Sequence, residues 1–248
     1  MVLSFQDGNY RFVQGVFPYS AAVSADSGFE IERVRFMRPV ALAEGFKAIE
    51  AHLSAIGRPL TALCACELRS PAPFTEEGFR AFNGEYVGVL RKWGIFRDDI
   101  NPVARSNVCP EIDPPATPSF HAFAYTVPAR TSARTSFIVA GAAEAPEGKP
   151  NYRDFIIRRG DVSPAALLEK AQWVLGEMER RAGALGVGWN EVTATQLYTI
   201  HDVHPFLASE LVKRGATSGG LTWHYTRPPV VDLDYEMDCR GVARELVI

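Results

Sequence analysis

Two arginine-containing stretches of this chain have the residue types needed to bind an anionic substrate. One is Ala104-Arg105-Ser106-Asn107, and the other is the doubled Ala-Arg-Thr of residues 128–136. The planar guanidinium of arginine pairs with a carboxylate through two parallel hydrogen bonds and stays charged at physiological pH. Both stretches are therefore candidates for a carboxylate site, and the elements around them must decide between them.

A second concentration of polar and aromatic residues follows residue 221. Residues 222–229 read Thr-Trp-His-Tyr-Thr-Arg-Pro-Pro, and carboxylates then alternate at Asp232, Asp234, Glu236 and Asp238. On a strand, such alternation places all four on one face, which is costly if they are buried without partners. Two interpretations stay open. The strand has a solvated edge face, or Glu236 pairs with Arg227 or with substrate while His224 or Glu236 is the acid/base group.

Metal chemistry has little support in the sequence. His201-Asp202-Val203-His204 offers two ligands in a loop without a clear third, and structural or catalytic zinc sites need three or four. The four cysteines are scattered, so neither a disulfide framework nor a zinc knuckle is indicated. We expect no metal site, and turn chemistry for the two histidines.

Composition places the chain among ordinary soluble globular proteins. Of its 248 residues 47% are hydrophobic and 22% are charged, and the formal net charge is −3. Without clustered basic residues there is no electrostatic case for nucleic acid or an anionic membrane as partner. No apolar run approaches the length of a membrane span, and the first residues lack a signal-peptide pattern. A cytoplasmic location is expected.

The elements around these residues repeat, which indicates two diverged copies of one unit. Leu60–Leu68 parallels Val192–Ile200, and each is preceded by an amphipathic helix and followed by a Pro-Phe pair. A Pro-Pro pair and an alternating strand come later in each copy. Strands with one or two helices on one face predict an α+β fold. The predicted domains are residues 1–128, with two helices, and residues 129–248, with a shortened second helix.

The motifs of the first copy resemble those of the reactive intermediate deaminase (RidA/YjgF) family. Phe17–Val34 is similar to the family's Pro-Tyr opening strand, Phe79–Leu90 to its Phe-x-x-x-Asn-x-x-Tyr helix, and Val103–Val127 to its Ala-Arg-Ser/Thr and closing strands. The second copy is similar more loosely, through Phe137–Pro146. The resemblance implies two tandem RidA/chorismate-mutase-like units, each a mixed sheet covered on one face by helices. It also implies a homotrimer.

The order of these motifs decides between the two arginine stretches. After Arg105 come the strand, the Pro-Pro turn and the closing strand that the family requires. After Arg130 and Arg134 comes Phe137–Gly141, which belongs to the early strand of the next copy. Residues 128–136 are therefore interpreted as a junction between the copies, and Arg105 as the anion clamp.

The same resemblance implies the chemistry and the residues. Family members hydrolyse a reactive enamine or imine to a carbonyl compound and ammonia, with no metal or organic cofactor. By position Arg105 would clamp a small carboxylic acid substrate and Tyr19 would line the pocket. Asn83 matches the family's helix asparagine, whose role is a structural hydrogen bond or a ligand contact.

The acid/base group is where this sequence departs from the family. Ser119 stands at the position of the family glutamate in the first copy, with His121 nearby, so that copy's acid/base group is in doubt. Glu236 lies near the corresponding position of the second copy, which has no arginine clamp. Glu236 and His224 are therefore the acid/base candidates, and Ser119, Trp223 and Arg227 are candidate substrate contacts.

Three functions remain open on this scaffold. The first is an enamine or imine deaminase of a small carboxylate-bearing substrate. The second is a hydrolase or deaminase of ring-opened aromatic acids of the aminomuconate type, since related folds also include aminomuconate deaminases and chorismate-cleaving hydrolases. The third is a non-catalytic protein that binds a small ligand or supports assembly, which the loss of the glutamate at Ser119 favours. Fold alone does not choose among them.

Overall fold

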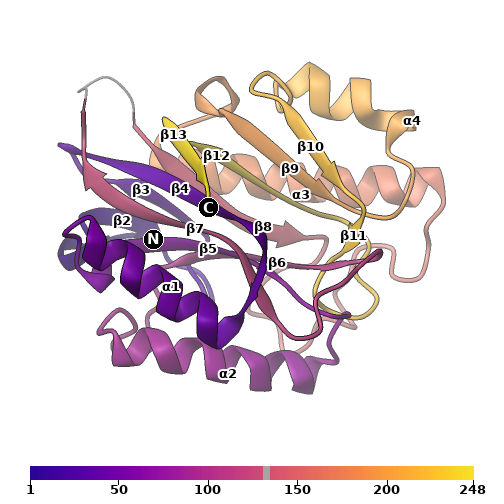
Figure 1. The fold of residues 1–248 in the computed structure, drawn as a ribbon. Coiled ribbons are helices and arrows are strands. Elements are labelled where there is room, and N and C mark those ends of the chain that lie inside the picture. Colours follow the sequence, from indigo (N-terminus) through magenta and orange to yellow (C-terminus); the bar gives the residue numbers. More distant parts are fainter. Residues whose placement is uncertain (131–134) are drawn as a thin grey trace.

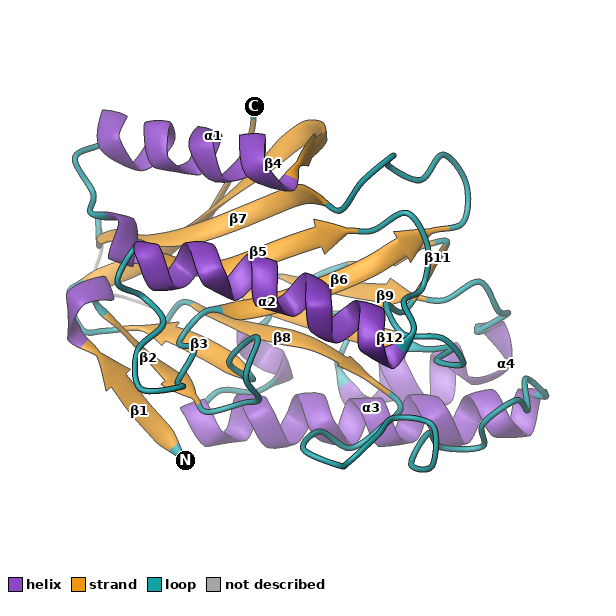
Figure 2. Cartoon of the chain, turned by 90° about the horizontal axis from the view of Figure 1, so that it is seen from below, coloured by secondary structure: helices purple, strands orange, loops and turns teal. Residues whose placement is uncertain are grey.

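Two β-sheets lie against each other in the middle of the molecule and helices cover their outer sides (Figure 1). The computed structural model describes residues 1–130 and 135–248. Helices α1 (Leu42–Ala55) and α2 (Glu76–Lys92) cover one sheet. The other is covered by α3 (Pro164–Leu185) and α4 (His204–Phe206), the latter continued by a π-helix (Leu207–Val212). Figure 2 shows the same layers from below. The predicted α+β class is confirmed.

Each sheet is mixed. The first sheet has the order β11 (Thr226–Arg227), β6 (Ala104–Pro110), β5 (Leu63–Arg69), β7 (Ser119–Pro128), β4 (Phe29–Ala41) and β13 (Arg244–Val247). The second sheet has the order β1 (Val2–Phe5), β2 (Tyr10–Val13), β3 (Ala22–Ala25), β8 (Phe137–Ala143), β12 (Glu236–Gly241), β9 (Ala194–Tyr198) and β10 (Leu221–His224). The short 3-10 turns are Gln6–Gly8, Leu60–Ala62 and Trp189–Glu191.

The two sheets share a four-strand pattern. In the first, β6 runs parallel to β5, and β7 and β4 follow in antiparallel pairings. In the second, β10 runs parallel to β9, and β12 and β8 follow in the same way. Strands beyond this pattern cross between the halves of the sequence, because β1–β3 join the second sheet while β11 and β13 join the first. The division into domains 1–128 and 129–248 stays a prediction.

Local sequence explains where the helices begin and end. Thr75 Oγ1 accepts a hydrogen bond from Gly78 N at the start of α2, and Ser163 Oγ accepts one from Ala166 N at the start of α3. Such caps satisfy amide groups that have no partner within the helix. Gly186 follows α3 with φ of 78°, a conformation that favours glycine. The buried face of α3 also contains two cations, Lys170 and Arg181.

The alternating acidic segment forms a shorter strand than its pattern predicts. β12 begins only at Glu236, and Asp232 lies outside the strand in a left-handed conformation with φ of 73°. Asp232 pairs with Arg159 instead, at 2.8 Å. β12 lies between β8 and β9, and Glu236 and Asp238 are both buried. The interpretation of a solvated edge strand with four carboxylates on one face is therefore wrong.

Arg134 of the predicted junction lies outside the described residues, whereas Arg130 approaches Glu32 Oε1 at 3.4 Å. Within residues 1–130 and 135–248, no helix has the length and apolar character to cross a membrane.

Candidate active site

A small cavity of about 40 Å³, the inner cavity, lies where β6 of the first sheet meets β8 and β12 of the second. Seven polar side chains line it: Tyr19, Arg105, Asn107, Glu147, Tyr152, Arg181 and Glu236. Three of them precede residue 128 and four follow it, so both halves of the sequence contribute to the wall. The structure thus brings Arg105, Tyr19 and Glu236 of the sequence-derived candidates together.

Arg105 is a buried cation held by aromatic rings. Its Cζ lies 5.0 Å from the ring centre of Tyr86 and 5.1 Å from that of Tyr19, and Phe79 and Phe82 complete the surround. Burial lowers the pKa of Arg105, although arginine stays charged in proteins. Among the described residues Arg105 forms no ion pair, and its Nη1 has no hydrogen-bond partner. A buried cation in this state is ready to bind an anion.

Glu236 enters the inner cavity from the start of β12. Burial raises its pKa well above the usual range, and the nearby carboxyl groups of Asp238 and Glu144 raise it further. Arg105 and Arg181 oppose this shift without cancelling it. No ion pair or side-chain hydrogen bond of Glu236 is found in the described part of the chain. Glu236 therefore keeps its proton to a higher pH than an exposed glutamate does, as a general acid near neutral pH requires.

Gly141 on β8 makes room for this arrangement. A Cβ atom at this position would collide with the Glu236 carboxyl group and would lie 3.2 Å from Ser106 Cα. The two sheets can therefore approach this closely only with glycine at position 141, and any larger residue would displace the acid.

The remaining wall is a hydrogen-bonded group of three side chains. Tyr19 Oη donates to Glu147 Oε1 at 2.8 Å, and Arg181 Nη2 donates to the same oxygen at 3.0 Å. Arg181 also donates from Nη1 to the carbonyl groups of Ala140 and Gly141. Burial raises the pKa of Tyr19, and Glu147 adds to this effect. Arg181 is thus a second cation of the cavity, but one with a carboxylate partner.

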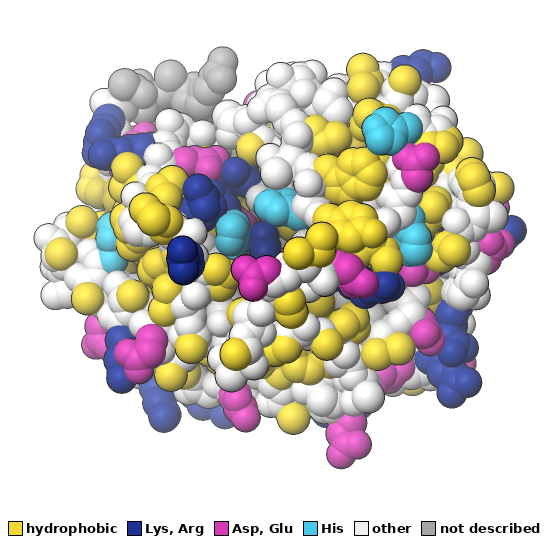
Figure 3. Space-filling view, turned by 45° about the vertical axis from the view of Figure 1, so that its right-hand side comes forward, with side chains coloured by type: hydrophobic (Ala, Val, Ile, Leu, Met, Phe, Trp, Pro, Cys, Tyr) yellow, Lys and Arg dark blue, Asp and Glu magenta, His cyan; other side chains and the backbone are white. Residues whose placement is uncertain are grey.

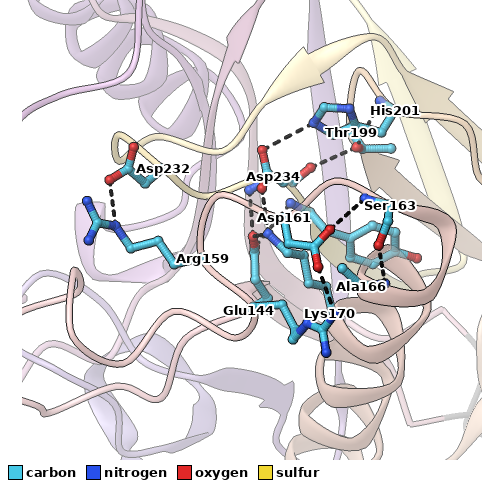
Figure 4. A network of polar contacts seen from close by, with 12 residues as sticks. Glu144, Arg159, Asp161, Ser163, Ala166, Lys170, Thr199, His201, Asp232 and Asp234 are labelled. Carbon is cyan, nitrogen blue, oxygen red and sulfur yellow. Dashed lines mark hydrogen bonds and ion pairs between the residues drawn. The ribbon is translucent and has the colours of Figure 1, made fainter.

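A polar network behind the cavity fixes the start of β12 (Figure 4). Glu144 accepts hydrogen bonds from the backbone N–H groups of Asp234, at 2.6 Å, and Tyr235, at 3.0 Å. Lys170 Nζ lies 3.3 Å from Glu144 Oε1 and also pairs with Asp234. His201 Nε2 lies 3.1 Å from Asp234 Oδ1. Because Asp234 and Tyr235 directly precede Glu236, this network sets the position from which Glu236 enters the cavity.

The other sequence-derived candidates lie outside the inner cavity. Ser119 Oγ donates to the carbonyl group of Thr117 at 2.8 Å. Arg227 pairs with Glu111 at 2.7 Å, so the interpretation that it pairs with Glu236 is wrong. Asn83 lines a larger neighbouring pocket. The predicted roles of these residues stay predictions.

His224 lies at a second polar cluster between the sheets, whereas the adjacent Trp223 is 38% exposed and its ring centre lies 5.7 Å from that of His204. Histidine and arginine side chains gather near the centre of the face drawn in Figure 3. The His224 ring stacks on Tyr198 at 5.2 Å and lies 6.2 Å from that of His121. Tyr198 separates His224 from Glu236 in register across β12, β9 and β10. Burial and Arg69 lower the pKa of His224 to about 4. Trp223 Nε1 donates to the carbonyl group of Thr199.

Most charged groups of this second cluster are paired, but the buried Arg69 forms no ion pair with any described residue and its Nη2 has no hydrogen-bond partner. Arg33 contacts both carboxylate oxygens of Glu67 and also pairs with Glu245. Asp238 accepts hydrogen bonds from Ser106, Gln196 and Tyr198. Although burial opposes it, Arg33 lowers the pKa of Glu67 well below its usual range. We interpret this cluster as the polar contact that joins the two sheets.

Four wall residues of the inner cavity were not among the sequence-derived candidates: Asn107, Glu147, Tyr152 and Arg181. Asn107 lies two residues after Arg105, on the same strand. The sequence does indicate Arg181, because this charged residue lies three positions after Met178 on the apolar face of α3. A cation on such a face needs a buried partner or a ligand. Glu147 and Tyr152 lie in the loop after β8 and have no such pattern.

Chemically, the inner cavity offers an anion clamp and a protonated acid on facing walls. Arg105 can hold a carboxylate, and Glu236 can give a proton to a bound molecule or later take one from water. Within the described ranges, no group of three His, Cys, Asp or Glu side chains is placed to hold a metal ion. The arrangement fits acid/base chemistry on a small carboxylic acid.

Comparison with known proteins gives the following similarities. The profile of a family described as "2-aminomuconate deaminase CnbZ" matches residues 2–246. A 2-amino-5-chloromuconate deaminase of Comamonas testosteroni is 54% identical over 245 residues, which cover 98% of each chain. Among solved structures, a chorismatase matches with a TM-score of 0.52 and 13% identity, over 90% of this chain and 77% of that one. The YjgF gene product of E. coli matches with a TM-score of 0.31 and 16% identity, over 46% of this chain and 85% of that one.

Proposed function

The chain belongs to the 2-aminomuconate deaminase CnbZ family. We propose that it removes the amino group of a 2-aminomuconate-type acid by hydrolysis. Such an acid is an enamine with a carboxylate on the carbon that bears nitrogen, and a second carboxylate at the far end. The observation that carries the proposal is Arg105, a buried cation without an acid partner, together with Glu236, a buried acid with a raised pKa, on one cavity. Membership of this family indicates that the protein is an enzyme and argues against the non-catalytic alternative.

In the proposed reaction Arg105 holds the carboxylate next to the amino-bearing carbon. Protonated Glu236 gives its proton to the carbon chain of the enamine, which becomes an imine. The resulting carboxylate takes a proton from water as the water oxygen bonds to the imine carbon. Glu236, protonated again, gives its proton to the amino nitrogen and takes one from the new hydroxyl group as the C–N bond breaks. Ammonia leaves and a keto acid remains, so the balance is one water consumed and one ammonia released. Holding water and imine together supplies much of the acceleration.

Asn107 and Tyr19 complete the proposed site. Asn107 lines the cavity with an Nδ2 group that has no partner in the described structure, so it can donate to substrate. Tyr19 stacks on Arg105 and fixes Glu147, which in turn fixes Arg181. Homotrimer assembly and a cytoplasmic location stay predictions.

The proposal is tested with Arg105→Ala, assayed by ammonia release from 2-aminomuconate and 2-amino-5-chloromuconate. Loss of a charged hydrogen-bond partner costs about 1.5–3 kcal/mol, so kcat/KM should fall by about 10- to 150-fold. Arg180→Ala is the matched control, because Arg180 is an exposed arginine that pairs with Glu177. An inactive wild-type protein would refute the reaction. Full activity in Arg105→Ala would refute the assignment of the clamp.

A further inference from the structure

The inner cavity is too small for the whole of a six-carbon diacid. To hold one water molecule, a cavity needs roughly 10–15 Å³ of space that the centre of a water-sized sphere can occupy. The inner cavity, at about 40 Å³, therefore has room for about three waters or for one carboxylate with its neighbouring carbon. The rest of a muconate-sized substrate must lie elsewhere.

A second and larger pocket, the outer pocket, lies next to the inner cavity. Its volume is about 280 Å³, and Phe79, Glu147 and Tyr152 line both spaces. The walls of the outer pocket come from α2, from residues 16–18 and from the loop 146–152. Phe79, Glu147 and Tyr152 thus form a neck between the two, and a molecule that lies through the neck would have one end at Arg105.

The loop that forms one side of the neck is fixed to α2. Glu76 Oε1 accepts hydrogen bonds from the backbone N–H groups of Tyr152, at 3.0 Å, and Arg153, at 3.2 Å. Phe79 packs against Tyr152 with their ring centres 6.4 Å apart. Glu76 thus bonds to the loop, and Glu147 bonds to Tyr19 and Arg181. Neither acid forms an ion pair with Arg80 or Lys149 in the described part of the chain.

Two side chains of the outer pocket are suited to a carboxylate. Asn83 is 5% exposed and its Oδ1 has no hydrogen-bond partner. Its Nδ2 is not fully buried and forms no hydrogen bond with any described residue, so it can donate to a carboxylate oxygen. Arg80 lies one turn earlier on α2 and forms no ion pair with any described residue. The other cation, Lys149, lies over the Phe155 ring at 5.3 Å.

We propose that the outer pocket is the subsite for the distal carboxylate of an unsaturated six-carbon diacid, with Arg80 as its cation and Asn83 as its hydrogen-bond donor. This inference rests on the proposed function and adds the orientation of the substrate. The amino-bearing end lies at Arg105 and Glu236, the carbon chain passes through the neck beside Phe79 and Tyr152, and the far carboxylate lies at α2. Selectivity for diacids over short imino acids then resides in α2.

The first test measures binding without turnover. Muconate has both carboxylates and no amino group, and crotonate has one carboxylate. Calorimetry should show that Arg80→Gln weakens muconate binding by about 10- to 100-fold, as expected for a lost charge-assisted hydrogen bond, and leaves crotonate binding unchanged. Arg80→Lys should recover part of the loss. Arg91→Gln is the matched control, because Arg91 lies on the same helix over Phe96.

The outcome of this test is independent of catalysis. Equal muconate affinity in the wild type and Arg80→Gln would overturn the subsite, and so would a wild type that does not bind muconate. Equal losses for muconate and crotonate would overturn it too. Failure of the deamination reaction is measured separately, as absence of ammonia release by the wild type.

A kinetic measurement sharpens the same point. With 2-aminomuconate, Arg80→Gln and Asn83→Ala should raise KM more than they lower kcat, because the distal carboxylate is held equally before and during the reaction. With 2-iminopropionate, generated in situ from alanine by an amino-acid oxidase, both variants should match the wild type. A drop in kcat of the same size for both substrates would place Arg80 outside any subsite.

Discussion

Glu144, one residue after the end of β8, and Glu236, at the start of β12, are two buried glutamates whose surroundings differ. Glu144 has two backbone N–H donors and the Lys170 ammonium group within hydrogen-bond distance. Glu236 has no such donor among the described residues, and Arg105 lines the same cavity without touching it. Burial raises the pKa of Glu144 to about 7 and that of Glu236 well above its usual range. A buried acid with its donors in place holds the fold together, whereas one left apart from its cation is available to a substrate.

The largest expected effect comes from removing the acid of Glu236. In Glu236→Gln we expect kcat to fall by about 10²–10⁴-fold, the usual contribution of general acid/base catalysis. The amide has the same shape and carries no charge, so the free energy of unfolding should change little. Stopped assays of ammonia release give kcat, and urea denaturation gives stability. Activity within threefold of the wild type would show that Glu236 is not the acid/base group.

A substitution in the Glu144 network should lower the free energy of unfolding and leave the catalytic step largely unchanged. Lys170→Met leaves Glu144 buried without its cation, which costs about 3–5 kcal/mol of unfolding free energy when the carboxylate is charged. The loss should be smaller at pH 5 than at pH 8, because Glu144 then takes up a proton. Urea denaturation at both pH values measures the difference. Glu144→Gln combined with Lys170→Met should remove the pH dependence of the loss.

The wild type should show the corresponding pH trend. The pKa of Glu144 is about 7 in the folded state and near 4.5 when unfolded. Between these values the folded state binds more protons, so the contribution of Glu144 to the free energy of unfolding falls as pH rises. Glu236 has a pKa shift in the same direction. A contribution that rises with pH across this window would contradict the assignment of Glu144 as a desolvated acid.

The smallest expected effect concerns the histidine between the sheets. His224 is separated from Glu236 by Tyr198 and does not line the inner cavity. We expect His224→Asn to change kcat/KM by less than about threefold, an effect as small as that of a substitution remote from the site. The catalytic role predicted for His224 from the sequence would be supported by a loss of about a hundredfold or more, in the general acid/base range.

The sequence allowed good prediction of features that depend on local pattern. The mixed α+β class follows from the strand and helix patterns and is confirmed by the two mixed sheets. The choice of Arg105 over the 128–136 stretch follows from motif order and stays a prediction. Arg105, Tyr19 and Glu236 were identified as candidates, and the structure places all three at one cavity. Each of these predictions needed only residues near one another along the chain or the order of motifs.

The features missed depend on contacts between distant segments. Arg181 reaches the cavity only because α3 packs beside β8, more than 35 residues earlier. The pairing of β13 with β4 joins residues about 210 apart. No period or turn signal encodes such a pairing. The predicted strand with Asp232 on its face was wrong for a local reason. Asp232 has a left-handed conformation, which the alternation of residue types does not reveal.

The exchange of strands between the two sheets has a consequence for biosynthesis. As the ribosome makes the chain, β4 emerges long before β13, and β1–β3 emerge before β8, the partner of β3. Neither sheet can be completed from the first 128 residues alone. Until the later strands are made, the nascent first half therefore has unpaired strand edges, which are prone to pair with other chains. The cavity, too, acquires its acid only at residue 236, after all the other strands of the second sheet have been made.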